Sequence, residues 1–333
     1  MKVAINGFGR IGRLVFRIMN EDPFMEVVAI NDLTDAKQLA YLLKYDTNHR
    51  NYKLDQISYD DDELIVDNKH IKIFKELDPE NLPWDEMGID VVFECTGKFV
   101  DLEGAKKHVL AGAKKVVISA PGKGDMKTIV YNVNENILDG SEQVISAASC
   151  TTNCLAPVLK VLDDNFGIVG GSMTTIHAYT NDQVILDIAH KKGIESRRGR
   201  AGAMNIIPSS TGAAKAIGKV LPLLDGKLDG SAMRVPVGTG SVIDLTLELK
   251  TNVDVDMINC AFDNNVNDTL SITYDPIVSS DIIGSCYGAL VDGLLTSVIN
   301  VDDKQYVKVV AWYDNEMGYS NQMVKTAKYW VNL

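Results

Sequence analysis

Short apolar runs alternate with amphipathic stretches over the first 120 residues. The runs at 2–6, 25–32, 90–96 and 115–119 are typical of buried strands. The stretches between them with helical spacing cover 10–20, 37–43 and 102–111. Strands that alternate with helices predict a doubly wound, Rossmann-type parallel sheet, because right-handed crossovers place helices on both of its faces. A ligand of such a sheet binds at the carboxyl ends of the strands.

The pattern changes after about residue 150. Long runs in which apolar and polar residues alternate are typical of antiparallel strands, and they cover 170–180, 229–237, 241–249 and 304–313. The last stretch, 318–331, has apolar residues at helical spacing, and we expect this helix to pack on the first domain.

A chain of 333 residues is long enough for two domains of about 150 residues each. We predict an α/β protein whose Rossmann domain covers residues 1–149 and is completed by a C-terminal helix at 316–333. The second domain, over residues 150–315, is expected to be an α+β domain of mainly antiparallel sheet.

Composition and charge narrow the function. The chain has 33 Lys and Arg against 45 Asp and Glu, a net charge of −12, so it repels polyanions and general nucleic-acid binding is not expected. The five cysteines form no CxxC pair and have no nearby histidine, so we expect free thiols and no metal site. Free thiols, no recognisable signal sequence and no apolar run of 18 residues predict a cytoplasmic protein without membrane contact.

A glycine fingerprint, Gly7-x-Gly9-x-x-Gly12, lies where the first predicted strand meets the first helix. Gly7 permits a tight turn, Gly9 lets a pyrophosphate approach the backbone, and Gly12 allows close helix packing. Asp32 lies 20 residues beyond Gly12, at the end of the second strand, where a carboxylate suits a ribose hydroxyl and repels a 2′-phosphate. The alternative is an ordinary strand-to-helix turn, but the position of the motif and Asp32 together favour NAD binding.

Cys150 is the candidate nucleophile. It precedes the apolar run 155–162, which places it in the first turn of a predicted helix, where free N–H groups stabilise a thiolate. Cys154, one turn further on, is expected to be a small core residue. His177, in the predicted strand 170–180, is a candidate base for Cys150. Taken alone, such a histidine is more often a core residue, and a lone cysteine is more often inert.

Two stretches of the second domain suit an anion. The arginine cluster at 197–200 lies on a glycine-containing loop, from which guanidinium groups can make bidentate phosphate contacts. The hydroxyl-rich stretch 209–212 precedes a predicted helix at 213–220, and Arg234 lies in a predicted strand. The structural alternatives are a solvated or subunit-contacting arginine face and an ordinary helix N-cap. Four histidines without ligand spacing are interpreted as surface residues: His49, His70, His108 and His190.

These motifs together closely resemble the phosphorylating glyceraldehyde-3-phosphate dehydrogenase family. The resemblance covers essentially the whole chain and rests on NGFGRIGR at 6–13, SCTTNC at 149–154, HAYT at 177–180, NIIPSSTGAAKAIG at 205–218 and WYDNEMGYS at 312–320. The cysteine motif and the segment at 205–218 are far more specific to that family than the glycine fingerprint.

The resemblance implies NAD-dependent oxidation of D-glyceraldehyde 3-phosphate to 1,3-bisphosphoglycerate. Cys150 would attack the aldehyde to give a thiohemiacetal, with His177 activating the thiol. Hydride would pass to NAD, and inorganic phosphate would cleave the resulting thioester. Thr180 and Arg234 would hold the substrate's phosphate, with Asp182 positioning Arg234. The attacking phosphate would be bound by Ser149, Thr151, Thr211, Gly212 and Arg198.

The resemblance also implies a set of cofactor contacts. They are Gly7, Gly9, Arg10 and Ile11 at the pyrophosphate, Asp32 at the adenosine ribose, Thr96 and Ser119 along the cofactor, and Asn315 at the carboxamide. The family is typically a homotetramer in which the loop at 197–203 reaches a neighbouring subunit's cofactor.

Four features depart from the family pattern. Ala147 replaces a frequent Asn, Leu77 a usual Arg, and Ile188-Ala189 a common Leu-Pro, while 193–196 lengthen a loop. Ala189 weakens the preference for NAD, but Asp32 outweighs it because a carboxylate facing a phosphate costs on the order of several kcal/mol.

Two other functions stay open at this stage. A relative that acts on erythrose 4-phosphate would use the same thiol and cofactor. A binding or adhesive protein could retain the fold, but it would have no reason to keep every residue of the catalytic set. That set is Cys150, His177, Thr180, Arg198, Thr211 and Arg234. The acidic charge disfavours RNA as a main partner.

Overall fold

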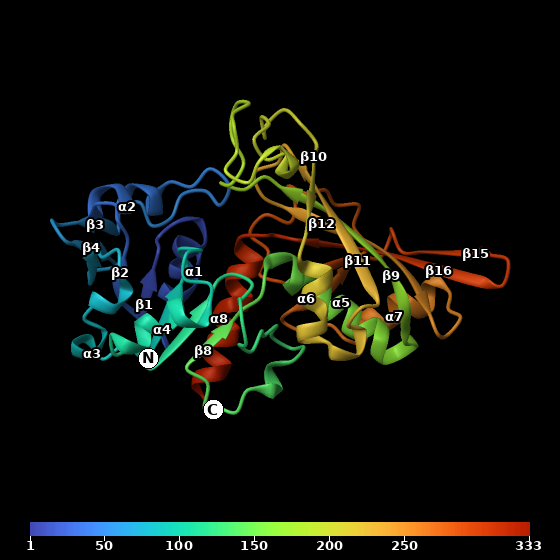
Figure 1. The fold of residues 1–333 in the computed structure, drawn as a ribbon, viewed down its shortest axis with the longest axis horizontal. Helices are drawn as coiled ribbons and strands as arrows, with labels where there is room; N and C mark the ends of the chain where they lie inside the picture. The colour runs from blue at the N-terminus through green and yellow to red at the C-terminus, as the bar shows by residue number, and fades with distance from the viewer. The chain divides into compact units, whose positions relative to one another are not determined.

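The computed structural model describes residues 1–333 and divides into two compact units (Figure 1). The first unit comprises Met1–Ile129, Glu135–Ala148 and Met323–Leu333, and the second comprises Val130–Asn134 and Ser149–Gln322. Each unit carries one eight-stranded sheet and has its own core.

The sheet of the first unit is parallel over most of its width. Its strands are β1 (Lys2–Asn6), β2 (Glu26–Asn31), β3 (Ile57–Tyr59), β4 (Glu63–Val66), β5 (Lys69–Phe74), β6 (Val91–Glu94), β7 (Lys115–Ile118) and β8 (Val144–Ser146). They follow the order β3-β4-β5-β2-β1-β6-β7-β8, and all pairs from β5 to β8 are parallel. Asn6 pairs with Asn31 on one side and Glu94 on the other, so three carboxyl ends lie next to one another.

A hairpin at one edge of this sheet is not predicted from the sequence. β3 pairs antiparallel with β4, and β4 pairs antiparallel with β5. Asp67 and Asn68, which join β4 to β5, have φ of 50° and 61°, the left-handed conformation that a type I′ turn requires. These strands are only three to six residues long, so their alternation is too brief to stand out.

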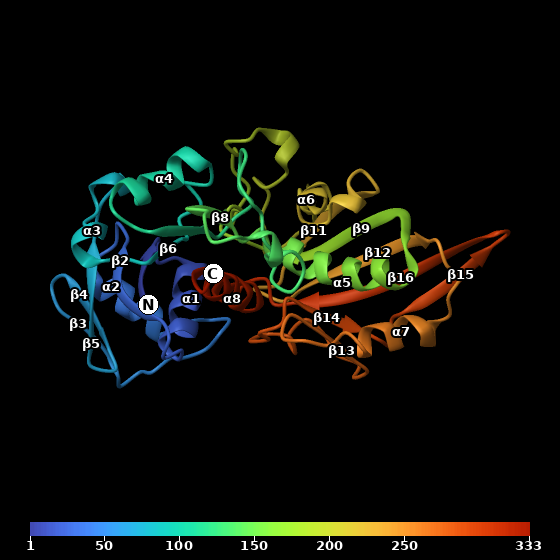
Figure 2. The same cartoon turned by 90° about the horizontal axis from the view of Figure 1, so that it is seen from below.

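Helices cover both faces of this sheet. They are α1 (Arg10–Asn20), α2 (Ala36–Lys44), α3 (Trp84–Met87) and α4 (Leu102–Leu110), with 3-10 turns η1 (Pro79–Asn81) and η2 (Glu135–Ile137). α1 and α4 begin crossovers that run in opposite directions from the middle of the sheet, so the right-handed rule puts them on opposite faces (Figure 2). Val3, Ala4 and Ile5 are consequently all fully buried, although successive side chains point to opposite faces.

The sheet of the second unit is mostly antiparallel. Its strands are β9 (Ile168–Ala178), β10 (Ile207–Ser210), β11 (Leu228–Val235), β12 (Ser241–Leu249), β13 (Leu270–Thr273), β14 (Ala289–Asp292), β15 (Ser297–Val301) and β16 (Lys304–Tyr313). The order is β10-β11-β9-β12-β16-β14-β13, and β15 pairs with β16. Only the pairs β9–β11 and β13–β14 are parallel. The two sheets confirm the fold class predicted from the sequence.

Three helices cover one face of the second sheet. They are α5 (Cys150–Phe166), α6 (Ala213–Val220) and α7 (Val255–Asp263), and α5 packs between the other two (Figure 2). The remaining helical elements are η3 (Ile194–Ser196), η4 (Pro222–Leu224) and α8 (Met317–Val331). No helix of the structure combines the length and the apolar character needed to cross a membrane.

Candidate active site

Cys150 is the first residue of α5. The hydroxyl of Ser149, the N-cap, accepts a hydrogen bond from the Thr152 amide at 3.1 Å. This cap fixes the start of the helix, so Cys150 lies where unpaired N–H groups and the helix dipole favour negative charge. Cys154, one turn further along, is fully buried, which confirms its predicted place in the core.

His177 lies next to the last residue of β9 and faces Cys150. Its Nε2 is 3.5 Å from the Cys150 Sγ, and its Nδ1 is 2.7 Å from the Ala178 carbonyl oxygen. The tautomer with its proton on Nδ1 can donate to this carbonyl and turns the lone pair of Nε2 toward the thiol, although the Arg234 Nη1, which only donates, also lies 2.7 Å from Nδ1. The structure therefore brings the candidate nucleophile and the candidate base together.

Burial governs the ionisation of this pair. Burial raises the pKa of the Cys150 thiol, and the charge of Arg234 and hydrogen bonds at the start of α5 oppose that shift without cancelling it. Burial and the charge of Arg234 lower the pKa of His177 to about 3. Both shifts favour the neutral thiol and the neutral imidazole over the thiolate and the imidazolium. Attack by sulfur requires proton transfer to Nε2.

Arg234 reaches the pair from the neighbouring strand. It lies in β11 directly opposite His177 in β9, and its Nη1 is 2.7 Å from the His177 Nδ1 and 2.9 Å from the Ala178 carbonyl oxygen. Its Nε is buried without a hydrogen-bond partner. Because an orphaned buried donor is costly, this guanidinium suits an anionic ligand that would supply the missing acceptor.

Thr180 and Arg198 meet at Asp182. The Thr180 hydroxyl donates to the Asp182 Oδ1 at 2.5 Å, and the Arg198 guanidinium pairs with the Oδ2. The family resemblance implies that Asp182 positions Arg234, and the structure differs, because Asp182 pairs with Arg198 while the Nη1 of Arg234 bonds to the Ala178 carbonyl. Asp182 thus joins residues of two predicted anion sites.

The other predicted phosphate residues lie at helix starts. Gly212 is the N-cap of α6, and the Thr211 hydroxyl accepts from the Ala213 amide at 3.2 Å. The Thr151 hydroxyl is buried and lies 3.0 Å from the Tyr313 hydroxyl. Thr151 is therefore able to serve an anion only through its backbone N–H, since its side chain points into the core.

The amide of Asn315 is held in one orientation. Its Oδ1 accepts from the Ser241 hydroxyl at 2.8 Å and from the Gly240 N–H at 3.2 Å. A backbone N–H can only donate, so the atom that it meets is the amide oxygen. The Nδ2 of Asn315 is consequently presented on the other side as a donor.

The glycine turn of the first unit is built for close approach. Gly7 has a φ of 90°, and a Cβ there would lie 2.8 Å from the Thr96 nitrogen. A Cβ on Gly12 would lie 2.1 Å from the Gly7 carbonyl oxygen. Nothing lies within 4 Å of the Cβ position of Gly9. The turn thus requires Gly7 and Gly12, and Gly9 leaves the N-terminus of α1 open to a ligand.

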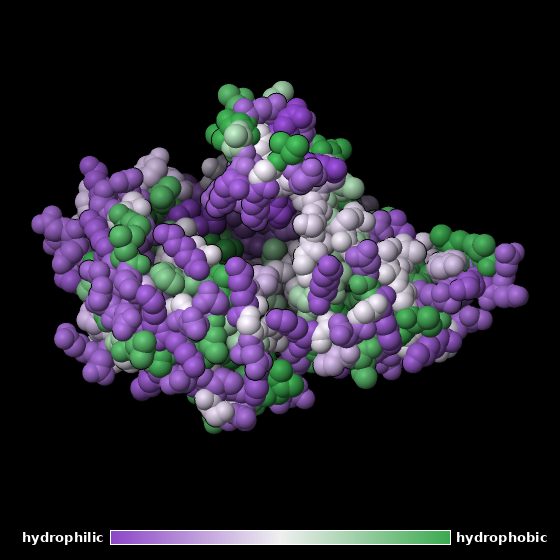
Figure 3. All heavy atoms as spheres, in the orientation of Figure 1, coloured by the Kyte–Doolittle hydropathy of each residue, from purple (hydrophilic) through white to green (hydrophobic).

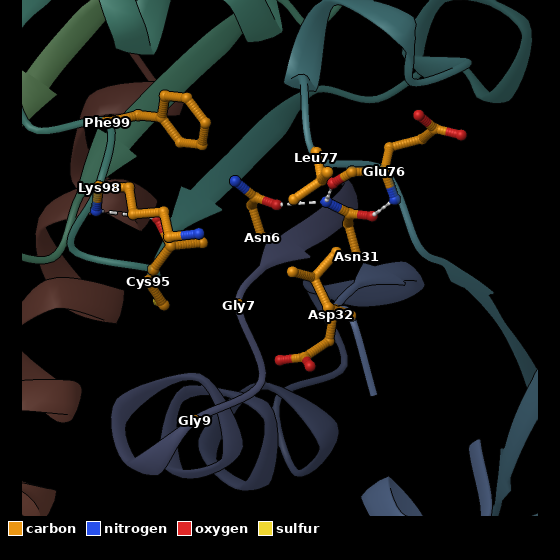
Figure 4. A pocket seen from close by; sticks show the side chains of 12 residues that line it. Asn6, Gly7, Gly9, Asn31, Asp32, Glu76, Leu77, Cys95, Lys98 and Phe99 are labelled. Carbon is orange, nitrogen blue, oxygen red and sulfur yellow. Dashed lines mark hydrogen bonds between the residues drawn. The ribbon is translucent and has the colours of Figure 1, made fainter. Parts of the chain in front are cut away.

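A pocket lies beside this turn at the carboxyl ends of β1, β2 and β6 (Figure 4). The Asp32 carboxylate in its wall accepts from the Phe8 and Thr34 amides at 2.7 and 3.0 Å. A fixed carboxylate beside apolar side chains suits a nucleoside, with the ribose on the carboxylate and the base on the apolar wall. The lining residues are Asn6, Gly7, Gly9, Asn31, Asp32, Leu33, Glu76, Leu77, Cys95, Thr96, Lys98 and Phe99.

The predicted cofactor residues of this unit fall into two groups. Gly7, Gly9, Asp32 and Thr96 line the pocket, whereas Arg10, Ile11 and Ser119 do not. The Arg10 side chain pairs with Asp46, so only the backbone N–H of Arg10, at the start of α1, is available to bind an anion. Leu77, where the family usually has Arg, contributes an apolar and largely exposed side chain to the lining of the pocket.

Sequence reasoning misses a buried polar chain behind the pocket. The Asn6 amide donates to the Glu94 Oε2 at 2.5 Å, and the same oxygen is 3.1 Å from the His108 Nε2. The Trp84 indole donates to the His108 Nδ1 at 3.0 Å, which fixes the proton of His108 on Nε2, facing Glu94. These hydrogen bonds hold the Asn6 side chain, which lines the pocket, in place.

The interpretation of His108 and His49 as surface residues is wrong. His108 is fully buried, and the side chain of His49 is 1% exposed against Asp46. His108 lies three positions after the buried Ala105 in α4, so helical spacing was the signal that could have shown its burial. The side chain of His70 is exposed, as predicted.

Comparison with known proteins gives the family. Residues 1–102 match the family model "Glyceraldehyde 3-phosphate dehydrogenase, NAD binding domain", and residues 149–315 match its C-terminal domain. A glyceraldehyde-3-phosphate dehydrogenase of Clostridium pasteurianum is 58% identical over 332 residues, and one of Clostridium acetobutylicum is 57% identical over the same length. One from Streptococcus pyogenes serotype M1 is 56% identical over 334 residues. Each alignment covers 100% of this chain and 99% of the relative. The chain therefore belongs to the glyceraldehyde 3-phosphate dehydrogenase family and is an oxidoreductase with NAD as its cofactor.

Proposed function

We propose that the protein oxidises D-glyceraldehyde 3-phosphate to 1,3-bisphosphoglycerate with NAD and inorganic phosphate, the reaction used in glycolysis and gluconeogenesis. The observation that carries this proposal is the Cys150–His177 pair at 3.5 Å, with Arg234 beside it. A thiol with its own base and a neighbouring guanidinium suits an aldehyde that carries a phosphate.

Cys150 forms the bond to the substrate. As its sulfur attacks the aldehyde carbon, the Nε2 of His177 takes the thiol proton, and the protonated ring stabilises the oxygen of the thiohemiacetal. Loss of a hydride from the former aldehyde carbon turns this intermediate into a thioester, and NAD held by the cofactor residues would supply the hydride acceptor. Because the energy of oxidation is kept in the thioester, the site must exclude water until phosphate attacks. Phosphate then releases the acyl phosphate and returns Cys150 to a thiol.

Two sets of residues serve the two phosphate groups. Thr180 and Arg234 bind the phosphate of the substrate, and the unpartnered Nε of Arg234 supports this role. Arg198, with Ser149, Thr151, Thr211 and Gly212 at two helix starts, binds the attacking phosphate. The guanidinium groups of Arg234 and Arg198 offset the negative charges of the two phosphate groups.

Each predicted cofactor residue has its own role. Asp32 accepts from the adenosine ribose, and the backbone N–H groups of Arg10 and Ile11 bind the pyrophosphate. Thr96 and Ser119 lie along the cofactor. Asn315 donates from its Nδ2 to the carboxamide oxygen, which its fixed amide orientation supports.

NADH formation tests the proposed function. We expect absorbance at about 340 nm to rise with glyceraldehyde 3-phosphate and NAD only when inorganic phosphate is present, because phosphate must release the thioester. Cys150→Ser should abolish this turnover and leave NAD binding unchanged, whereas Cys286→Ser, at an exposed cysteine, should match the wild type.

Three results would contradict the proposal. Sustained turnover without phosphate would mean that water cleaves the thioester. A higher kcat/KM with erythrose 4-phosphate would assign the enzyme to the four-carbon substrate. Full activity of Cys150→Ser would remove Cys150 from the reaction.

We also propose that the protein is a cytoplasmic homotetramer. Five free cysteines support a reducing compartment. Exposed apolar side chains on one loop of the second unit support contact with another copy of the chain. They are Ile185, Leu186, Ile188, Ile194, Met204 and Ile206, each at least 62% exposed.

A further inference from the structure

The Ser241 hydroxyl bonds to groups that serve two different steps of the reaction. We infer that Ser241 is a positioning residue, which orients the Asn315 amide toward the nicotinamide carboxamide and fixes the Ala178 peptide that holds His177. This inference rests on the proposed role of Asn315.

The hydrogen bonds run in one direction through Ser241. The Ala178 N–H donates to the Ser241 Oγ at 3.1 Å, and the Ser241 hydroxyl donates to the Asn315 Oδ1 at 2.8 Å. The oxygen of Ser241 is thus used as an acceptor and its hydrogen as a donor. On the far side of the same peptide, the Ala178 carbonyl lies 2.7 Å from the His177 Nδ1.

The sheet places Ser241 where these contacts are possible. Ser241 is the first residue of β12 and pairs with Tyr313 of β16, two positions before Asn315. Its neighbour Val242 pairs with Ile176 of β9, next to His177. Ends of three strands therefore lie around one hydroxyl, and this hydroxyl bridges Ala178, the last residue of β9, to Asn315, two residues after the end of β16.

Burial raises the free-energy cost of losing the hydrogen bonds of Ser241. Ser241 is 1% exposed, Asn315 is 5% exposed and His177 is 4% exposed. Water has little access, so losing the hydroxyl would leave the Ala178 N–H without its acceptor and remove a donor from the Asn315 amide. The Gly240 N–H, at 3.2 Å, and the Thr239 hydroxyl, at 3.4 Å, would remain as the weaker constraints on the amide.

A double-mutant cycle on NAD affinity tests the inference. Ser241→Ala should weaken NAD binding about tenfold in calorimetry, because one buried hydrogen bond to the amide is lost. In an Asn315→Ala background, the same change should have no further effect, since the group through which Ser241 acts is gone. Equal losses in both backgrounds would overturn the inference.

Matched variants separate positioning from general destabilisation. Ser241→Thr retains the hydroxyl and should bind NAD within about threefold of the wild type. Ser320→Ala removes a serine hydroxyl that is equally buried and donates to the Glu316 carbonyl at 2.7 Å, and it should leave NAD affinity unchanged. If Ser241→Ala does not fold, Ser241→Thr and Ser241→Cys replace it in the cycle, with loss expected only for the cysteine variant. Equal affinity of these two variants would contradict the inference.

A second measurement distinguishes failure of the inference from failure of the proposed function. NAD affinity is measured without aldehyde, so coupling between Ser241 and Asn315 is tested even if glyceraldehyde 3-phosphate is not the substrate. With an active enzyme, Ser241→Ala should also mix the faces of deuteride transfer from 4-deuterated NADH, which loss of stability alone would not do. Strict retention of one face would contradict the role assigned to Asn315.

Discussion

Backbone groups orient several of the side chains that carry the function. The Asp32 carboxylate accepts from two amides, the Asn315 amide from the Gly240 N–H, and the His177 ring lies against the Ala178 carbonyl. Such bonds hold a side chain in place before a ligand arrives, so less conformational entropy is lost on binding. They also decide which atom of each side chain faces the ligand.

Removal of the Asp32 carboxylate should relax the cofactor preference. Asp32→Gly removes the charge that repels a 2′-phosphate, so the ratio of kcat/KM for NADP to that for NAD should rise by at least about tenfold. Asp61→Gly, which removes an exposed aspartate from the same unit, should leave the ratio unchanged. An unchanged ratio for Asp32→Gly would mean that Asp32 does not face the ribose.

Elements with a long, regular pattern are the ones that the sequence predicts well. The bounds of α1, α6, β12 and β16 agree with the predicted ranges, because each has at least eight residues and so shows its period. The pattern does not predict the hairpin formed by β3, β4 and β5, because β3 and β4 have only three and four residues.

The contacts at the site could be predicted only in part. The proximity of Cys150 and His177 follows from a helix start and a strand end that the motifs indicate. The direction of the Thr151 hydroxyl and the pairing of Asp182 with Arg198 depend on tertiary contacts that no local pattern contains. The burial of His108 was detectable, since the helix places it on the face of Ala105.

The segment after α2 is held by charged groups of α1. Asp46 pairs with Arg10 and accepts from the Asn48 and His49 amides at 2.9 Å. Burial alone would raise the pKa of Asp46, but hydrogen bonds from His49 and Arg10 outweigh it and hold the pKa well below its usual range. The ionised form of Asp46 is therefore the form that stabilises the native segment.

The acid stability of Asp46→Asn tests this pairing. The pKa of Asp46 is lower in the folded than in the unfolded chain, so its contribution is fully present above about pH 5 and is lost as the pH falls below about 4. Urea unfolding should show a variant about 3 kcal/mol less stable than the wild type at pH 7, with a gap that narrows toward pH 3. Asp61→Asn, at an exposed position, should show no gap. A gap independent of pH would contradict the assignment.

At the scale of the whole molecule, charge and exposed apolar surface act in opposite directions. The net charge of −12 opposes association in general. The apolar loop that includes Ile185 and Ile194 favours it locally, because those side chains are 84% and 90% exposed in one chain. Association is therefore expected to be specific to the surface that carries this loop.

Light scattering after size exclusion tests the proposed tetramer. We expect a mass of four times 36.5 kDa for the wild type. Ile194→Glu should shift the distribution toward smaller species, because it places a charge on the apolar loop. The control is Val278→Glu, at an exposed apolar position outside this loop, which should leave the distribution of species unchanged. A monomeric wild type would contradict the proposal.

The ribbon of β15 and β16 projects from the second unit (Figure 1), and β15 has a strand partner on one side only. Ile299 and Val301 are about half exposed, and apolar side chains gather along this ribbon while hydrophilic ones cover its tip (Figure 3). An open, partly apolar strand edge is a template for aggregation. Asp302 and Asp303 at the tip place negative charge next to this edge, and charged residues that flank an open strand disfavour its pairing with another chain.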